Sequence, residues 1–131
     1  MASRHDDLVR ACFDAWNRDD FDAARGYMHP QIEWRTSGHF PGMEPVYNGP
    51  EEVRRWWRAL KDPWEYFSIH VERTFDHDAV DVAIVRFEAV GRGSGVKVDL
   101  PFVTVWRFED GLIRWYASYD SLEAAGIADE R

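Results

Sequence analysis

The sequence is poor in the residues that mark several large classes of protein. Cys12 is the single cysteine among 131 residues, which excludes an internal disulfide framework and is compatible with a reducing compartment. The formal net charge is −8, whereas nucleic acids and anionic membranes require a basic surface. No apolar run approaches the roughly 20 residues of a transmembrane helix, and the N-terminal MASRHDDLVR has no apolar segment of a secretion signal. We therefore expect a cytoplasmic protein that binds neither nucleic acid nor membrane.

Motifs that bind cofactors or activate nucleophiles are also missing. The chain has no G-x-G-x-x-G, P-loop or G-x-S-x-G motif. The glycine-rich GRGSG at residues 91–95 leads into a strand pattern and not a helix, so it predicts a turn and not a phosphate site. None of the histidines is paired at metal-ligand spacing; they are His5, His29, His39, His70 and His77. We expect neither a metal nor a cofactor.

Aromatic residues, by contrast, are abundant: they make up 15% of the chain and include seven tryptophans. Each large aromatic side chain buries roughly 150–250 Å², which is more than a small core needs for volume alone. Some of these rings are therefore candidates for the wall of a cavity that binds a small hydrophobic molecule. Packing in a lean core or in a dimer interface is the other interpretation. The candidate ligand-binding rings are Trp16, Trp34, Phe40, Trp57, Phe102, Trp106 and Tyr119.

Apolar spacing predicts two helices near the N-terminus. The first begins near Ser3, with Asp6 three residues on as in a capping box, and continues as an apolar stripe at helical spacing. Asp19 or Asp20 then caps a short second helix.

A strand and a third helix follow. Residues 29–36 alternate as a strand, and residues 37–50 have the composition of a loop. The third helix begins at Pro50, which suits a first helical turn. It ends before Pro63, because the residue before a proline is pushed out of helical space.

From Glu65 onward the pattern is strand after strand. Asp110-Gly111 is a strong signal for a two-residue hairpin turn. After the last strand, Asp120 followed by SLEAAG has the form of a short C-terminal helix that Gly126 ends. We predict one α+β domain over residues 1–131, in which a curved, mixed or antiparallel sheet wraps around the N-terminal helices as a cone.

The hairpin turn also predicts a register for the last two strands. Counting back from it pairs Glu109 with Leu112 and Thr104 with Ala117. Thr104 and Ala117 are then expected on one face of the sheet, as neighbours across the strands.

Three stretches resemble a known superfamily: FDAWNRDDFDAARGYMHPQIEW, YNGPEEVRRWW and FEDGLIRWYASYDSLEAAGI. They are similar to the SnoaL-like branch of the nuclear transport factor 2-like superfamily, and the resemblance covers nearly the whole chain. Relatives include polyketide cyclases, ketosteroid isomerase and limonene epoxide hydrolase, as well as members that only bind ligands or partners. The resemblance implies the cone fold and a homodimer, but one scaffold carries many unrelated sites.

The relatives' catalytic positions carry over without their carboxylates. The resemblance puts the isomerase's general base at Trp34, and the hydrolase's tyrosine and asparagine at Trp34 and Thr36. The isomerase's protonated aspartate falls near Thr104, and the hydrolase's last-strand aspartate near Ala117. Steroid isomerisation and epoxide hydrolysis by those mechanisms are therefore not expected.

Three charged residues are left as catalytic candidates. The resemblance to SnoaL-like cyclases points to Asp120 as the acid/base, although its sequence context also suits a helix cap. Arg86 and Glu88 stand two apart, on one face of a strand, and are similar to an Arg-x-Asp pair of the hydrolase. An ion pair within the sheet or at a dimer interface is the favoured interpretation of these two residues; anchoring of a carboxylate or phenolate by Arg86 is the functional alternative.

The expected function is binding of a small hydrophobic, cyclic or polyketide-like molecule in an aromatic-lined cone. If the domain is an enzyme, the fitting chemistry is cofactor-free proton transfer at a carbon beside a carbonyl, in an aldol cyclisation or an isomerisation. Asp120 would move the proton, and Arg86 or Thr104 would stabilise the enolate oxygen. The competing interpretation is a non-catalytic ligand-binding or dimeric interaction domain.

Overall fold

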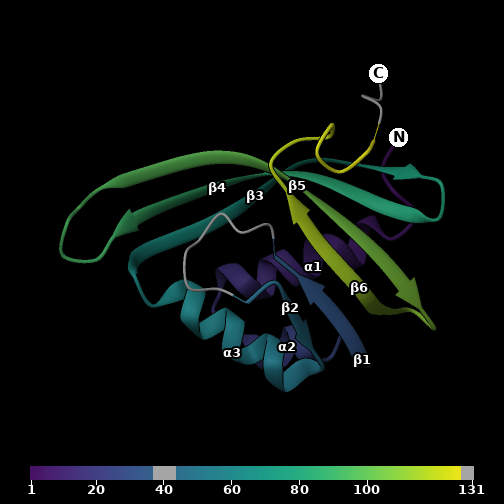
Figure 1. The fold of residues 1–131 in the computed structure, drawn as a ribbon, viewed down its shortest axis with the longest axis horizontal. Coiled ribbons are helices and arrows are strands. Elements are labelled where there is room, and N and C mark those ends of the chain that lie inside the picture. Colours follow the sequence, from purple (N-terminus) through teal and green to yellow (C-terminus); the bar gives the residue numbers. More distant parts are fainter. Residues whose placement is uncertain (37–43, 128–131) are drawn as a thin grey trace.

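Three helices and a six-stranded sheet form the part of the chain that the computed structural model describes, residues 1–36 and 44–127 (Figure 1). The helices are α1 (Asp6–Asn17), α2 (Phe21–Arg25) and α3 (Pro50–Lys61). The strands are β1 (Met28–Arg35), β2 (Val46–Asn48), β3 (Trp64–His77), β4 (Val80–Gly91), β5 (Lys97–Glu109) and β6 (Leu112–Tyr119). The predicted α+β class is confirmed. The short strand β2 was missed, because its three residues lie in a stretch of loop composition.

The sheet is mixed, with the strand order β2-β1-β6-β5-β4-β3. β1 runs parallel to β6, and the other neighbours are antiparallel. Figure 1 shows a bent sheet with the helices along one side of it, while β3 and β4 extend beyond them. We call the side that faces the helices the inner face and the opposite side the outer face.

The first helix begins later than predicted, at Asp6 and not near Ser3, because the residues before it bind to the sheet. The N–H of Ser3 donates to Oγ1 of Thr74 (3.0 Å), and the N–H of His5 donates to Oδ2 of Asp81 (2.6 Å). Asp6 does not complete a capping box: its carboxylate accepts the Thr74 hydroxyl (2.6 Å). The groups of Ser3 and Asp6 that were expected to cap the helix therefore bind β3 instead, and the neighbouring His5 binds β4.

We call these contacts of residues 3–6 with β3 and β4 the N-terminal attachment, and Asp81 is at its centre. It is 1% exposed, and its second oxygen lies 2.8 Å from Nδ1 of His5. The His5 ring stacks on Phe108 at 4.1 Å between centroids. A carboxylate so far from water is stabilised only while its partners stay in place.

The predicted register of β5 and β6 is correct at the hairpin and wrong beyond it. Asp110 and Gly111 have φ of 54° and 75°, as a two-residue turn requires, and Glu109 pairs with Leu112. A bulge then makes Arg114 an extra residue, so that Thr104 pairs with Ser118 and not with Ala117. A one-residue shift exchanges the faces of a strand. Ala117 therefore lies on the outer face.

The predicted C-terminal helix is absent from the described residues. Residues 121–127 form one turn, in which the N–H of Ile127 bonds to the carbonyl of Leu122 and that of Gly126 to Glu123. Gly126 has a φ of 74°. These two bonds and the left-handed glycine form a Schellman motif, which ends a helix. It closes after the first turn, before further hydrogen bonds can offset the cost of helix nucleation.

The core has two parts. The larger one fills the space between the inner face and the helices. A smaller one lies on the outer face, where Val82, Val103 and Val105 are covered by Leu122 and Ile127. No helix in residues 1–36 and 44–127 has the combination of length and apolar character that crossing a membrane requires.

The N-terminal attachment predicts the effect of removing the Asp81 carboxylate. Asp81→Ala leaves two donors of His5 without their acceptor, and we expect it to lower the free energy of unfolding by about 2–4 kcal/mol. Denaturant unfolding measures this. Glu123→Ala, at an exposed carboxylate, is the control and should cost less than about 0.5 kcal/mol. Equal effects of the two substitutions would show that the attachment contributes nothing.

Candidate functional site

The inner face of the sheet is walled by aromatic rings. Trp34 stacks on Tyr116 with centroids 3.7 Å apart, and it forms a T-shaped pair with Trp106 at 6.1 Å between centroids. Phe13 of α1 approaches Trp106 edge-on at 5.4 Å. β1, β6 and β5 position these rings, because alternate residues of a strand share a face. The predicted grouping of Trp34 with Trp106 on the inner face is confirmed.

The helices pack further aromatic rings directly against this face. Trp16 of α1 contacts Trp56 and Trp57 of α3 at 5.2 and 4.1 Å. Trp56 in turn lies 5.1 Å from Trp34. Trp16 and Trp57 are thus part of the same continuous aromatic cluster as Trp34. The helical spacing of Trp56 and Trp57 indicated burial but not which ring each would meet.

A small polar group lies within this cluster on β5 and β6. The Thr104 hydroxyl donates to the carbonyl of Ala83 (3.1 Å) and accepts Nε1 of Trp106 (2.8 Å), and both residues are 0% exposed. Ser118 of β6 pairs with Thr104 across the two strands and hydrogen-bonds to Tyr116. Sequence reasoning missed Tyr116 and Ser118, because the bulge at Arg114 reversed their predicted faces.

Burial sets the protonation of two groups beside this polar group. It raises the pKa of the Tyr116 hydroxyl well above the usual range; nearby Cys12 adds to the increase, and the bond to Ser118 opposes it. Burial also raises the pKa of the Cys12 thiol to about 12. Both groups stay protonated at neutral pH. Tyr116 is therefore a donor and Cys12 is not a nucleophile.

Two indoles of the cluster are unsatisfied. Nε1 of Trp16 and Nε1 of Trp34 are buried without a hydrogen-bond partner among the described residues. Each such donor costs about 1–3 kcal/mol. The indoles of Trp57, Trp106 and Trp115, by contrast, donate to Asp19, Thr104 and Glu33.

Lys61 closes the helical end of the cluster. Its Nζ lies 4.7 and 4.8 Å from the ring centroids of Trp16 and Trp57 and 3.1 Å from Oδ1 of Asp19. Burial lowers the pKa of Lys61, and Asp19 opposes this change. Lys61 also donates to the carbonyl of Trp16 near the end of α1. These contacts make it a structural cation that joins α3 to α1.

The remaining predicted ligand-binding residues lie in several places. Phe102 is half-buried on the inner face, with its ring 6.5 Å from that of Phe87. The Thr36 hydroxyl donates to the carbonyl of Glu44 (2.8 Å). Phe40 lies outside the described residues. Tyr119 belongs to the smaller core of the outer face, away from the inner rings.

Arg86 and Glu88 lie together on the outer face, as their spacing predicted. Arg86 is bound to Asp99 of β5 (2.5 Å), and this hydrogen bond and charge raise the pKa of the guanidinium. Glu88 lies 3.5 Å from Nε2 of His70. The structure therefore places both on the far side of the sheet from the aromatic cluster, in the arrangement of an intra-sheet ion pair.

Asp120 is exposed, immediately after β6. The turn that follows is capped by its neighbour: Oγ of Ser121 accepts the N–H of Ala124 (3.1 Å). Asp120 thus stands beyond the strand end, two residues from Ser118 and not within the ring cluster.

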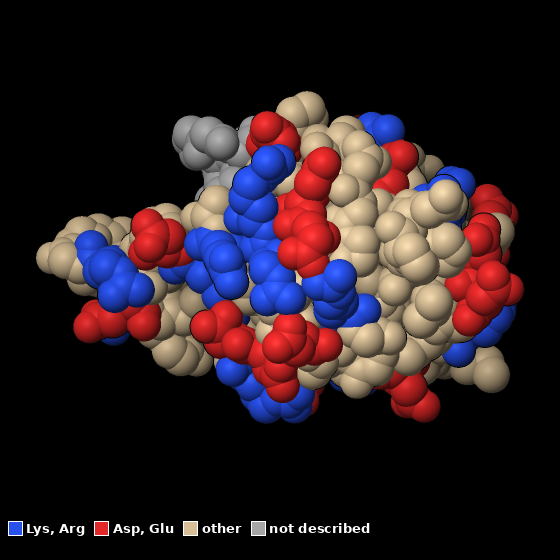
Figure 2. Space-filling view, turned by 90° about the horizontal axis from the view of Figure 1, so that it is seen from below, with Lys and Arg blue, Asp and Glu red and all other residues tan. Residues whose placement is uncertain are grey.

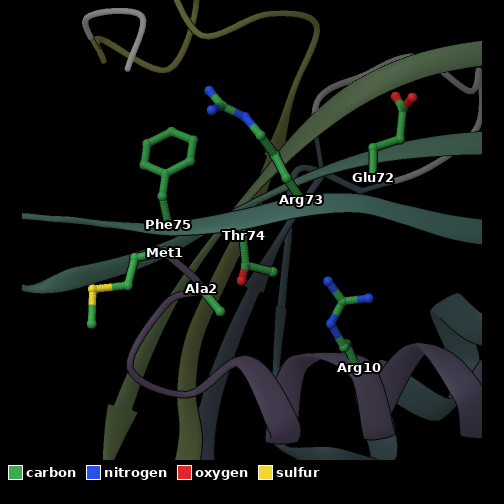
Figure 3. Close-up of a pocket in the computed structure, with 7 residues that line it drawn as sticks. All are labelled: Met1, Ala2, Arg10, Glu72, Arg73, Thr74 and Phe75. Carbon is green, nitrogen blue, oxygen red and sulfur yellow. The ribbon is translucent and has the colours of Figure 1, made fainter. Parts of the chain in front are cut away.

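Two open hollows lie outside the cluster. One, of about 410 Å³, is lined by residues of β3, by Arg10 and by the N-terminus (Figure 3). Both of its arginines are engaged: Arg10 binds Asp6 (2.9 Å), and Arg73 lies over the ring of Phe75. The other, of about 370 Å³, is on the outer face and includes Tyr119. We take neither as the primary site.

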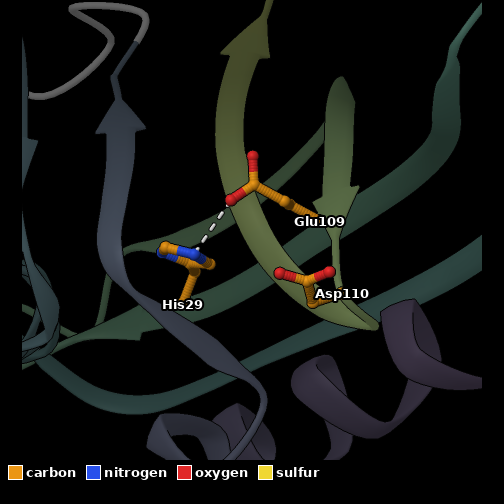
Figure 4. A group of neighbouring side chains, drawn as sticks. All are labelled: His29, Glu109 and Asp110. Atoms are coloured by element: carbon orange, nitrogen blue, oxygen red, sulfur yellow. Dashed lines mark ion pairs between the residues drawn. The ribbon is translucent and has the colours of Figure 1, made fainter.

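His29, Glu109 and Asp110 form a group of side chains near the β5–β6 turn (Figure 4). His29 Nε2 lies 3.0 Å from Glu109, while its Nδ1 accepts the N–H of Gln31 (3.0 Å). An accepting Nδ1 leaves the proton on Nε2, which therefore donates to Glu109 and has no lone pair for a cation. The geometry favours a hydrogen-bonded pair over a metal centre.

The surface that includes α3 carries both signs of charge. Figure 2 shows basic and acidic side chains interleaved there. Arg54 binds Asp22 (2.9 Å) and Arg55 binds Glu44 (3.0 Å). Because the basic groups are paired, this face is not the uncompensated basic surface that a nucleic acid requires.

The Thr104–Trp106 hydrogen bond can be tested with two substitutions. Thr104→Val keeps the volume but leaves the Trp106 N–H unpaired, and we expect a loss of about 1–3 kcal/mol in the free energy of unfolding. Thr104→Ser keeps the hydroxyl and is the control. In ¹⁵N-edited NMR spectra the Trp106 indole N–H signal should move in the Val variant only. Unchanged signals in both variants would disprove the bond.

Asp19 predicts a dependence of stability on pH. Its hydrogen bond from Trp57, together with Lys61 and Arg58, lowers the pKa of the carboxyl below 3.8 in the folded state. Its stabilising effect is therefore complete above that value and is lost as pH falls through the folded pKa. Asp19→Asn should destabilise at pH 7, and the difference from wild type should shrink towards pH 3.

Asparagine is a suitable replacement, because it tolerates the left-handed conformation of Asp19, whose φ is 56°. Urea unfolding across this pH range measures the difference. A constant difference between the two proteins would contradict the role of the charge.

The comparisons with known proteins agree with this fold. A structure of an NTF2-like protein of unknown function from Burkholderia pseudomallei has a TM-score of 0.80 at 20% identity, with 93% of this chain and 97% of that one covered. TerC, co-crystallised with polyporic acid, has a TM-score of 0.80 at 16% identity, with 95% and 96% covered. A candidate SnoaL-like polyketide cyclase from Jannaschia sp. has a TM-score of 0.76 at 20% identity, with 93% and 88% covered.

These identities are low, so the three structures show the fold and not the activity. No curated protein matches the sequence. The family model described as "SnoaL-like domain" matches residues 9–116, which confirms the resemblance found in the sequence. The chain therefore belongs to the SnoaL-like domain family, with the nuclear transport factor 2-like fold.

Proposed function

We propose that this domain binds a small hydrophobic, cyclic or polyketide-like molecule against the aromatic cluster of its inner face. The observation that carries the proposal is the combination of continuous rings with a few buried polar groups. Trp16, Trp34 and Trp106 are the buried apolar rings, and the buried Thr104 and the half-buried Ser118 provide hydroxyl groups on the same face. Ligand sites are typically apolar walls with a small number of positioned polar groups.

The comparisons support the same class of ligand. TerC was co-crystallised with polyporic acid, and the Jannaschia relative is a candidate polyketide cyclase. Both proteins have the fold of this chain. We therefore take cyclic, oxygenated aromatic compounds as the first ligands to test.

Binding without proton transfer is the function that the geometry favours. Cyclisation or isomerisation beside a carbonyl needs an acid/base within hydrogen-bond reach of the ligand. Asp120 is exposed beyond β6, and the buried Asp81 is bound to His5. Arg86 is paired with Asp99 on the outer face. The homodimer implied by the resemblance remains a prediction.

Ligand binding can be tested with a matched pair of tryptophans. A binder present at 100 times its Kd should stabilise the protein by about 2.7 kcal/mol, which a thermal-shift screen of aromatic polyketides and quinones detects. Trp34→Leu, on the inner face, should weaken binding by about tenfold or more. Trp115→Leu, on the outer face, should change it by less than about twofold.

Asp120→Asn separates binding from proton transfer, since the variant should bind like wild type. If no compound of the screen stabilises the protein, or if Trp34→Leu and Trp115→Leu act alike, the inner-face site is wrong. Turnover of a bound ketone that Asp120→Asn abolishes would establish the enzymatic alternative instead.

A further inference from the structure

Trp16 and Trp34 share an unusual property within the aromatic cluster. Each is 3% exposed, and the indole N–H of each has no acceptor among the described residues. They come from α1 and β1, and they lie on Trp56 of α3 at 5.2 and 5.1 Å. The two indoles that carry unsatisfied donors therefore both contact one ring, that of Trp56.

This pairing is not a general feature of the protein's tryptophans. Trp57, Trp106 and Trp115 all donate to an oxygen of a side chain. Within residues 1–36 and 44–127, the other buried side-chain atoms that lack a partner are Oγ of Ser3 and Nε1 of Trp64, whose ring packs on Phe87. A phenylalanine at position 16 or 34 would supply an apolar ring without a buried polar cost.

Contacts between an N–H and a ring face are the alternative explanation. For Trp34 the closest ring, Tyr116, gives no such contact, because it is stacked at 15° and the N–H lies in the plane of its own indole. Trp106 stands at 86° to Trp34, which leaves an N–H–ring contact open there. Trp16 meets Trp57 at 74°, which leaves an N–H–ring contact open at that position. The two explanations differ in whether a ligand oxygen changes the environment of the N–H.

We propose that the N–H groups of Trp16 and Trp34 are the donors that select ligands bearing an oxygen acceptor, namely aromatic ketones, quinones and phenolates. This inference rests on the proposed function, since it concerns the same inner-face site. A donor sealed from water binds a ligand oxygen more strongly than an exposed one does. A hydrocarbon of the same shape leaves both donors unpaired and is disfavoured.

The test uses two probes of nearly equal shape, the ketone 1-tetralone and the hydrocarbon tetralin. Trp16→Phe and Trp34→Phe keep a ring and remove only the N–H donor and the fused five-membered ring. We expect wild type to bind tetralone more tightly than tetralin. Each variant should lose about 3- to 10-fold in tetralone affinity, with tetralin affinity changed less than about twofold. Trp115→Phe on the outer face is the control and should change neither affinity.

NMR of the ¹⁵N-labelled wild type provides a second readout that does not depend on the variants folding. The indole N–H signals of Trp16 and Trp34 should move downfield with tetralone and not with tetralin. If both probes bind with equal affinity and these signals stay in place, the two N–H groups do not select the ligand and this inference is wrong, while the proposed inner-face binding site is retained. If neither probe nor any compound of the screen binds, the proposed function itself fails, and this inference fails with it.

Discussion

The rest of the structure depends on one constraint: aromatic rings hold the helices against the inner face of the sheet. Trp34, Trp106 and Tyr116 form one wall, and Trp16 and Trp56 form the other. Edge-to-face and stacked rings fix mutual orientation as well as burying area. The parallel pairing of β1 with β6 brings Trp34 onto Tyr116, although the two residues are 82 positions apart in the chain.

The sequence predicted the elements that local signals encode. Pro50 and the stripe of Val53, Trp56 and Trp57 specified α3, and Asp110-Gly111 specified the last hairpin. Parts that depend on distant partners were not predictable in this way. The late start of α1 depends on Thr74 and Asp81, and no periodicity reports contacts across 70 residues.

The same division between local signals and distant partners explains why only part of the candidate site was predicted. Alternation along β1 and β5 put Trp34, Thr104 and Trp106 on the inner face, as the structure has them. Tyr116 and Ser118 were missed, because the bulge at Arg114 leaves no mark in composition. The polar group on the inner face is therefore made of hydroxyls and indoles. Such groups suit recognition of an oxygen acceptor better than transfer of a proton.

The bulge at Arg114 also affects any attempt to redesign this scaffold as a catalyst. Counting from the hairpin turn alone suggests Ala117 as an inner-face position for an engineered carboxylate. That side chain faces the valines of the outer layer, where an acid would be buried without a partner. Ser118 faces Thr104 instead, so an engineered acid belongs one residue later.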